Sequence, residues 1–284
     1  MCTKSFLGVT AHYIENNKIM SRCLETKELD ERHTADYIAE NLRAICAKFH
    51  VETSKITCVV TDNGANMVAA VNSFVGRSSH LSCFAHSFNL VVETVYKLEP
   101  FCALTEKIRN VVKFFKNSVV YSDKLRSAQS CNSPKKPVLD VRTRWNSLYY
   151  MLDRYVELAP VIHQILLLDS KAPHLPTALE LKTIEEILDV LKPFEIATKE
   201  ISGENFVTVS KVIPIVKTLR AQMRNEMLKN ASSDLVLKMK TLLNNQLTTR
   251  FKNIEDNHIL ALSCVLDPRF KNIAFLEPHQ NFSI

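Results

Sequence analysis

The sequence predicts an α/β region followed by a larger region built only of helices. Runs with strand character gather near the N-terminus. From about residue 177 onward, apolar residues recur at spacings of three and four, which is typical of helices with one buried face. The chain of 284 residues contains 4 glycines, and 46% of its residues are hydrophobic. This composition favours helices with few tight turns and is sufficient for a sizeable core.

The first elements indicate a small mixed sheet. Residues 5–13 and 18–24 read as two strands of a hairpin, with a turn at residues 15–17. Thr34 can cap a helix that places Ile38, Leu42, Ile45 and Phe49 on one face. A third strand is predicted at residues 56–61. The order of strand, strand, helix and strand predicts a mixed sheet with a right-handed crossover.

The remainder reads as helices separated by loops. Helices are predicted at 84–96, 101–127, 144–168, 177–193, 209–223 and 234–251, with a loop at 130–137 and a short strand at 138–141. Thr177 and Glu180 form a capping-box pattern, and Pro193 is predicted to kink or end its helix. We therefore expect two domains, residues 1–170 and residues 171–284.

Bulk properties narrow the possible classes of protein. The formal net charge of +6 permits a nucleic-acid partner without requiring one. No apolar run approaches the roughly 20 residues that span a bilayer, and the first residues lack the apolar core of a secretory signal. The 8 cysteines are scattered without regular spacing. They are interpreted as reduced, buried thiols of a cytosolic or nuclear protein.

Asp62 is a candidate metal ligand because it follows an apolar strand directly. Ligands of open α/β sheets bind beyond the carboxyl ends of the strands. The alternative is structural, since the Asp62 carboxylate can accept hydrogen bonds from the amides of residues 63–65 and cap the helix that follows. The two roles are compatible.

Two further motifs each allow a functional and a structural interpretation. Cys83 and His86 have half the spacing of a zinc site, yet a closed zinc site needs four ligands, so a buried pair is the simpler reading. Trp145 lies next to Arg144 and close to Arg142, a combination on which an unpaired base can stack. The same residues can equally start a helix, with Trp145 anchored in the core.

The middle of the chain is biased toward basic residues. They are Lys107, Arg109, Lys113, Lys116, Lys124, Arg126, Lys135, Lys136, Arg142, Arg144 and Arg154, with few acidic residues among them. Such a stretch can contact a phosphate backbone, although many basic runs are simply solvated helix faces. A nucleophile elbow, a P-loop and a dinucleotide-binding glycine motif are absent from the sequence.

Six motifs taken together resemble one family. They are FLGVTAHY at 6–13, VTDNGANM at 60–67, CFAHSFNL at 83–90, TRWNS at 143–147, LKPFE at 191–195 and LDPRFK at 266–271. In this order the chain resembles the hAT-superfamily transposases, and in particular the zinc finger BED domain-containing proteins derived from them. The resemblance covers nearly the whole chain.

The resemblance implies a fold, a chemistry and a set of site residues. The implied fold is a truncated ribonuclease-H-like mixed sheet with a large all-α insertion, and the implied location is the nucleus. The family cleaves and transfers DNA strands with Mg²⁺ or Mn²⁺ held by an Asp-Asp-Glu triad, of which Asp62 matches the second Asp. The resemblance implies that Trp145 stacks on a base and that Cys83 and His86 are internal supports. With the basic stretch, the expected nucleic-acid contacts are Trp145, Arg144, Arg142, Lys135 and Lys136.

Departures from the family pattern change the expected function. The first Asp of the family precedes the strand at residue 6, and its Glu follows the helical insertion, so Asp62 is expected to be vestigial and no metal cofactor to be retained. The family's BED finger and dimerisation region are expected to lie outside this chain. Without the central strand of the family, the strands at 5–13 and 56–61 are expected either to pair directly or to leave an incomplete sheet.

Three hypotheses follow from the sequence. The first is a catalytically inactive, transposase-derived nuclear protein with residual binding of DNA or protein partners and a transcription-related role. The second is a segment of an active hAT transposase whose remaining catalytic residues lie outside this chain. The third is an interaction scaffold without affinity for DNA.

Overall fold

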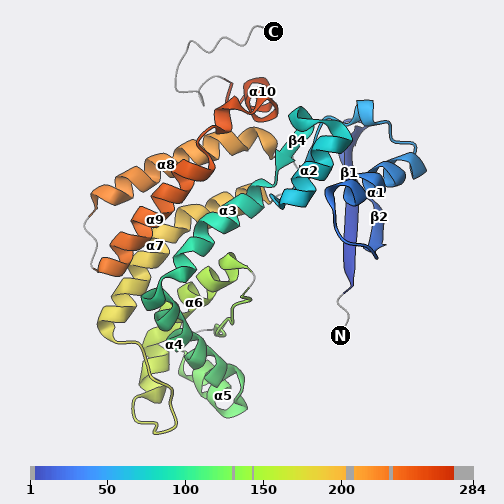
Figure 1. Ribbon diagram of the computed structural model, residues 1–284. Helices are drawn as coiled ribbons and strands as arrows, with labels where there is room; N and C mark the ends of the chain where they lie inside the picture. The colour runs from blue at the N-terminus through green and yellow to red at the C-terminus, as the bar shows by residue number, and fades with distance from the viewer. Residues whose placement is uncertain (1–3, 130–131, 143, 203–207, 230–232, 272–284) are drawn as a thin grey trace. The chain divides into compact units, whose positions relative to one another are not determined.

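The computed structural model describes residues 4–129, 132–142, 144–202, 208–229 and 233–271 (Figure 1). By their internal contacts these residues divide into two compact units. Unit 1 comprises residues 1–87, 202–212 and 255–284, and unit 2 comprises residues 88–201 and 213–254. The predicted domain boundary at residue 170 differs from this division and stays a prediction.

Unit 1 begins with the predicted hairpin. Strands β1 (Ser5–Glu15) and β2 (Lys18–Leu29) pair antiparallel, with a register shift between Val9 and Thr10. Asn16 and Asn17 join them with φ angles of 49° and 59°. Two consecutive positive φ angles are typical of the tight hairpin turn whose twist matches that of the strands. The hairpin prediction is therefore confirmed.

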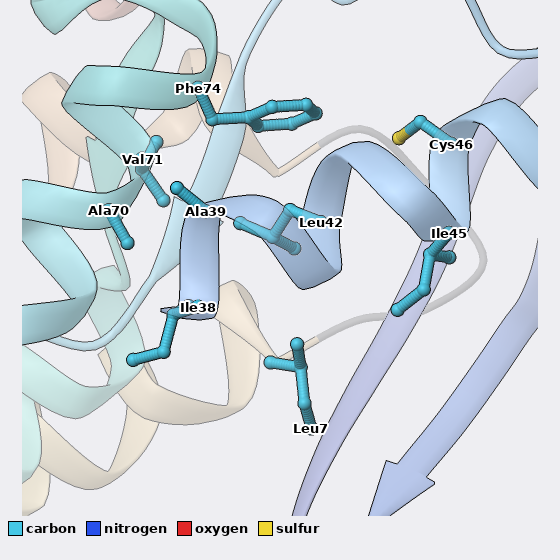
Figure 2. Packing of buried hydrophobic residues seen from close by; sticks show 9 residues of the cluster. All are labelled: Leu7, Ile38, Ala39, Leu42, Ile45, Cys46, Ala70, Val71 and Phe74. Carbon is cyan, nitrogen blue, oxygen red and sulfur yellow. The ribbon is translucent and has the colours of Figure 1, made fainter. Parts of the chain in front are cut away.

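Two helices and one residue of the hairpin, Leu7, form the buried core of unit 1. Helix α1 (Ala35–Lys48) starts at Thr34, whose side chain accepts the Tyr37 amide at 3.3 Å, as predicted. Helix α2 (Ala65–Val75) packs against α1. Figure 2 shows the buried cluster that these elements share: Leu7, Ile38, Ala39, Leu42, Ile45, Cys46, Ala70, Val71 and Phe74.

The predicted single mixed sheet is not found among the described residues. The predicted third strand is shorter than expected, β3 (Val59–Thr61), and it pairs in parallel with β4 (His80–Ser82), which the sequence analysis did not predict. In the part of the chain that the structure describes, the hairpin and the β3–β4 pair form separate two-stranded sheets. The prediction that the strands at 5–13 and 56–61 pair directly is thus wrong. The alternative prediction of an incomplete sheet agrees with the two separate sheets. A strand of three residues is too short to show the alternation that predicts a strand.

Unit 2 is helical throughout its described residues. The chain enters it within α3 (Phe84–Glu93), leaves it after residue 201, returns at the start of α8 (Val212–Leu228) and leaves it again after residue 254. Its other α-helices are α4 (Glu99–Lys116), α5 (Val119–Ala128), α6 (Trp145–Leu166), α7 (Ala178–Ile201) and α9 (Asp234–Arg250). The predicted all-α character of the second half is confirmed for these residues.

Three predictions for unit 2 need correction. The helix predicted at 101–127 is divided into α4 and α5, because Ser118 accepts the Tyr121 amide and starts a new helix. Residues 138–141 form no strand and lie instead in an irregular segment. Helix α7 continues through Pro193, because the neighbouring Leu191 and Phe194 are buried and outweigh the lost backbone hydrogen bond.

Other sequence features can also be compared with the structure. The capping box is confirmed, since the Glu180 amide donates to Thr177 Oγ1 at 3.2 Å and the Thr177 amide donates to Glu180 Oε2 at 2.7 Å. The cysteines are free where described, but Cys23 and Cys102 are exposed rather than buried. Cys2 and Cys131 lie outside the described residues. Among those residues, no helix has the length and apolar character needed to cross a bilayer.

The segment that follows α10 (His258–Leu266) is fixed by Asp267. Its carboxylate accepts Arg269 Nη2 at 2.6 Å and the hydroxyl of buried Ser210 at 2.7 Å. These contacts, that of Arg269 above all, lower the pKa of Asp267. They explain why the motif at 266–271 forms a defined turn within unit 1.

The lowered pKa of Asp267 predicts a pH-dependent contribution to stability. Because the folded pKa lies below the unfolded value of about 3.9, the contribution is complete above that value and is lost as pH falls through the folded pKa. Urea unfolding of the unmodified chain and Asp267→Asn between pH 3 and pH 7 measures it, with Asp123→Asn as an exposed control. We expect the difference in unfolding free energy to shrink below about pH 4. A difference that stays constant with pH would contradict this role.

Candidate functional site

The parallel pairing of β3 and β4 brings two predicted site residues to one edge. Thr61 lies opposite Ser82 in the register, so Asp62 and Cys83 follow the carboxyl ends of adjacent strands. The Cys83 amide donates to the Thr61 carbonyl at 2.6 Å and continues the ladder by one bond. The structure thus places Asp62 and Cys83 at the kind of edge where open sheets bind ligands.

The Asp62 carboxylate makes a local structural contact. Asp62 is exposed, and its Oδ1 accepts the Gly64 amide at 3.1 Å. Gly64 is the N-cap residue of α2, so Asp62 shapes the turn before the helix rather than occupying the cap itself. A Cβ at Gly64 would lie 3.2 Å from Asp62 Oδ1, and the glycine therefore permits this close approach.

The polar neighbours of Asp62 make hydrogen bonds to β4 and to α3. The Thr61 hydroxyl and His80 Nε2 are 2.9 Å apart, and burial lowers the pKa of His80. Asn63 Nδ2 donates to Ser87 Oγ at 3.4 Å. These contacts tie the loop after β3 to β4 and to the start of α3.

A two-metal clamp requires several oxygen ligands. At this edge Asp62 supplies one carboxylate, while the side chains of Thr61 and Asn63 are used in structural hydrogen bonds. In the described parts of the chain, no three His, Cys, Asp or Glu side chains gather into a group that could hold a metal ion. The described residues at this edge therefore do not fit the metal centre that the family resemblance implies.

Cys83 and His86 lie at the start of α3. Both are partly buried, and Cys83 is a free thiol. The Cys83 carbonyl accepts both the Ser87 amide at 3.0 Å and the Ser87 hydroxyl at 3.1 Å. The supporting role predicted for Cys83 and His86 agrees with their position and stays a prediction.

Trp145 is a core residue in this structure. Only 3% of it is exposed, and its carbonyl accepts the Tyr96 hydroxyl at 3.1 Å. Burial raises the pKa of Tyr96, which keeps that hydroxyl protonated as a donor. Stacking of Trp145 on a base is not available in this conformation, so the alternative interpretation as a core anchor describes its position here.

The remaining predicted contacts lie on an irregular segment before α6, which we call the basic loop and define as residues 132–142 and 144. Its exposed basic side chains are Lys135, Lys136, Arg142 and Arg144. The neighbouring Thr143 lies outside the described residues. The structure thus places these four side chains on one segment of unit 2.

A buried ion pair holds the basic loop to α4. Arg109 donates to Asp140 through Nε at 2.8 Å and through Nη2 at 2.7 Å, and these side chains are 11% and 3% exposed. The bond to Asp140 raises the pKa of Arg109, and Glu106 adds to this effect. Bidentate pairing of this kind fixes both position and orientation.

Hydrogen bonds hold the rest of the basic loop. Gln129 exchanges two bonds with the backbone of Lys135, at 2.8 and 2.9 Å. Ser147 binds the Val141 amide at 2.7 Å and the Arg144 carbonyl at 2.6 Å. The loop is thus fixed along its length although it contains no regular secondary structure.

The middle stretch carries less unpaired positive charge than its basic residues alone indicate. Many of its cations pair with carboxylates: Lys107 with Glu180, Arg109 with Asp140, Arg126 with Asp123, Lys135 and Arg154 with Glu157, and Arg142 with Glu106. Exposed pairs of this kind remain able to exchange partners, because each contributes little free energy. The basic loop keeps the capacity to contact phosphate, whereas the buried Arg109 does not.

Sequence reasoning missed the anchor of the basic loop. Asp140 is one of few acidic residues in a basic stretch, and Arg109 lies on the buried face of α4. An acid near the middle of a basic loop was the available signal for a structural ion pair. The partner could not be chosen from several nearby cations without the fold.

Comparisons with known proteins show which proteins the chain is similar to. Residues 81–190, which include the basic loop and Trp145, match the model of the ZBED1 RNase-like helical domain. The chain is 25% identical over 95% of its length to "Putative AC transposase" of Zea mays and 24% identical over 97% to zinc finger BED domain-containing protein 4 of Homo sapiens. It is also 24% identical over 76% of its length to "Putative transcriptional regulator tpeD" of Talaromyces stipitatus.

The predicted relationship is confirmed by these matches. The chain is a relative of the hAT transposases and of the zinc finger BED domain-containing proteins. It spans 35%, 24% and 30% of the lengths of the three proteins, about a quarter to a third of each.

Proposed function

We propose that this chain is a catalytically inactive, transposase-derived nuclear protein that binds nucleic acid through its basic loop. The supporting observation is the exposure of Lys135, Lys136, Arg142 and Arg144 on a segment held by the buried Arg109–Asp140 pair. A loop whose backbone is already held loses less conformational entropy on meeting a phosphate backbone than a mobile loop does. Protein partners and a transcription-related role form part of the proposal, in keeping with the name of the tpeD relative.

The proposed absence of catalysis is supported by the contact of Asp62. Its carboxylate accepts the Gly64 amide at the entry to α2, and a single carboxylate holds Mg²⁺ weakly. As part of the same proposal, residues 1–170 are a partial ribonuclease-H-like core and residues 171–284 belong to its helical insertion. Cys83 and His86 act as internal supports in this arrangement.

The alternative function is a segment of an active transposase. The observation that favours it is the position of Asp62 at the joint carboxyl edge of β3 and β4. In that case a complete enzyme would supply the missing ligands from other segments.

A nicking assay tests the proposed inactivity of this chain. The chain is incubated with hairpin and duplex DNA in Mg²⁺ or Mn²⁺, beside Asp62→Asn and the control Glu40→Gln, which removes another exposed carboxylate in unit 1. We expect no cleavage above background from any of the three proteins. Cleavage by the unmodified chain and by Glu40→Gln, but not by Asp62→Asn, would overturn the proposed inactivity.

A further inference from the structure

Helices α8 and α9 of unit 2 lie side by side and run antiparallel (Figure 1). Lys240 Nζ on α9 donates to the Glu226 carbonyl on α8 at 2.9 Å. Near the opposite ends of the pair, Arg220 Nη2 donates to the Phe251 carbonyl at 2.5 Å. The stretch of each helix between these two bonds therefore faces its neighbour.

An open hollow of about 280 Å³ lies beside the bond between Arg220 and Phe251. It is lined by Arg220 and Arg224 of α8, by Asn244 and Thr248 of α9, and by Lys252. Each set is spaced four residues apart, so successive side chains project from one face of each helix. The lining thus combines three cations with an amide and a hydroxyl, and none of the five residues is acidic.

Stabilisation of a helix end explains only part of this arrangement. Cations near the C-terminus of a helix bind its last carbonyls and offset its dipole, and Arg220 does so for α9 through Phe251. Arg224 lies on α8 and lines the hollow with Asn244, a residue of α9 that precedes the last turn of that helix. The dipole effect is confined to that last turn, so it does not explain the position of Arg224.

The chemistry of the hollow fits a phosphate group. Arg, Lys, Asn and Thr side chains are among the residues that contact phosphate oxygens in complexes with nucleic acids. Arg224 and Lys252 are exposed and can reach an anion without opening the core. The hollow is smaller than pockets that enclose whole small-molecule ligands and open enough for a phosphate that stays attached to a chain.

We propose that this hollow binds a backbone phosphate of a nucleic acid. The proposal rests on the proposed nucleic-acid binding by this chain and adds a second contact, separate from the basic loop. Arg224 and Lys252 supply the charge, and the Asn244 side-chain amide donates a hydrogen bond. The Thr248 hydroxyl lines the hollow and donates to the Asn244 carbonyl at 2.9 Å, while Arg220 fixes the backbone next to Lys252 through the Phe251 carbonyl.

Two binding experiments test this site. Fluorescence anisotropy measures the affinity for a labelled DNA duplex across a range of salt concentrations, and NMR follows the Arg224 side-chain signal during titration with inorganic phosphate. For Arg224→Ala combined with Lys252→Ala, we expect roughly 10-fold weaker duplex binding and a log K against log salt slope shallower by about 2. The charge-retaining pair Arg224→Lys and Lys252→Arg is expected to keep the slope.

Control variants distinguish the loss of this site from a general loss of positive charge. Arg32→Ala combined with Lys238→Ala removes one exposed Arg and one exposed Lys outside the hollow, and should leave the slope unchanged. If phosphate shifts the Arg224 signal but the alanine variant binds the duplex as tightly as the unmodified chain, the hollow binds free phosphate. That result would overturn the proposal that it binds a phosphate of a nucleic acid. If the alanine variant and the control behave alike, the site itself is overturned, whereas absence of duplex binding by the unmodified chain would overturn the proposed function.

Discussion

Replacing Asp140 by alanine is expected to lower the free energy of unfolding by about 3 to 5 kcal/mol, because it leaves the Arg109 charge buried without its bidentate partner. Both side chains are largely shielded from water in the native structure, with 11% and 3% exposed. Glu106 also pairs with Arg109, but its side chain is 42% exposed. This contact should keep the loss near the lower end of the range.

Urea unfolding of the complete chain measures this effect, with Asp123→Ala as a control. Asp123 pairs with Arg126 at 2.8 Å, and both side chains are more than half exposed, so the control should cost no more than about 0.5 kcal/mol. Replacing both partners, Arg109→Met with Asp140→Leu, should recover most of the stability lost in Asp140→Ala. Equal, small losses for Asp140→Ala and Asp123→Ala would contradict the role of the buried pair.

Removing the four basic side chains of the loop is expected to weaken binding to a DNA duplex roughly 10²-fold at about 0.1 M salt. The variant changes Lys135, Lys136, Arg142 and Arg144 to alanine. Glu157 and Glu106 compete for Lys135 and Arg142 in the free protein. The slope of log K against log salt should therefore become shallower by about 2 to 3, which is less than the value of about 3.6 for four full contacts.

A control of the same composition makes the comparison specific. Lys18, Arg22, Arg32 and Lys55 are exposed side chains of unit 1, and changing all four to alanine removes the same two lysines and two arginines. Anisotropy titrations should give this control nearly the slope of the unmodified chain. Equal changes in slope for both variants would indicate a diffuse charge effect and contradict binding through the basic loop.

Local features of this fold could be predicted from the sequence because their signals are local. The Asn16–Asn17 hairpin turn and the Thr177–Glu180 capping box depend on residues within a few positions of one another. The same holds for Thr34 at the start of α1. Apolar spacing likewise identified most helices of unit 2.

Features that depend on distant residues were not predicted. The pairing of β3 with β4 joins two strands of three residues, each too short to show a period. The Arg109–Asp140 pair joins positions 31 residues apart, and several cations were equally plausible partners for Asp140. Burial of Trp145 was one of two interpretations that the sequence left open, and the packing of unit 2 decides between them.

In the candidate site, too, local features could be predicted and features that depend on distant residues could not. The sequence identified Asp62 at the end of a strand and the basic residues of the loop, and the structure describes both positions. It also allowed the Asp62 carboxylate to accept an amide from residues 63–65, and the structure shows this bond to the Gly64 amide, where the glycine permits the close approach. The hollow between α8 and α9 could not be predicted from the sequence, because it forms only when the two helices pack side by side.

The most direct test of nucleic-acid binding is the affinity of the unmodified chain for a DNA duplex. It is measured across salt concentrations from about 50 to about 300 mM, which include the physiological ionic strength of about 150 mM. Binding through the basic loop predicts that log K falls linearly with log salt and that the slope becomes shallower when the four loop residues are changed to alanine. A flat plot, or no binding at the lowest salt concentration, would contradict phosphate contact and favour an interaction scaffold without affinity for DNA.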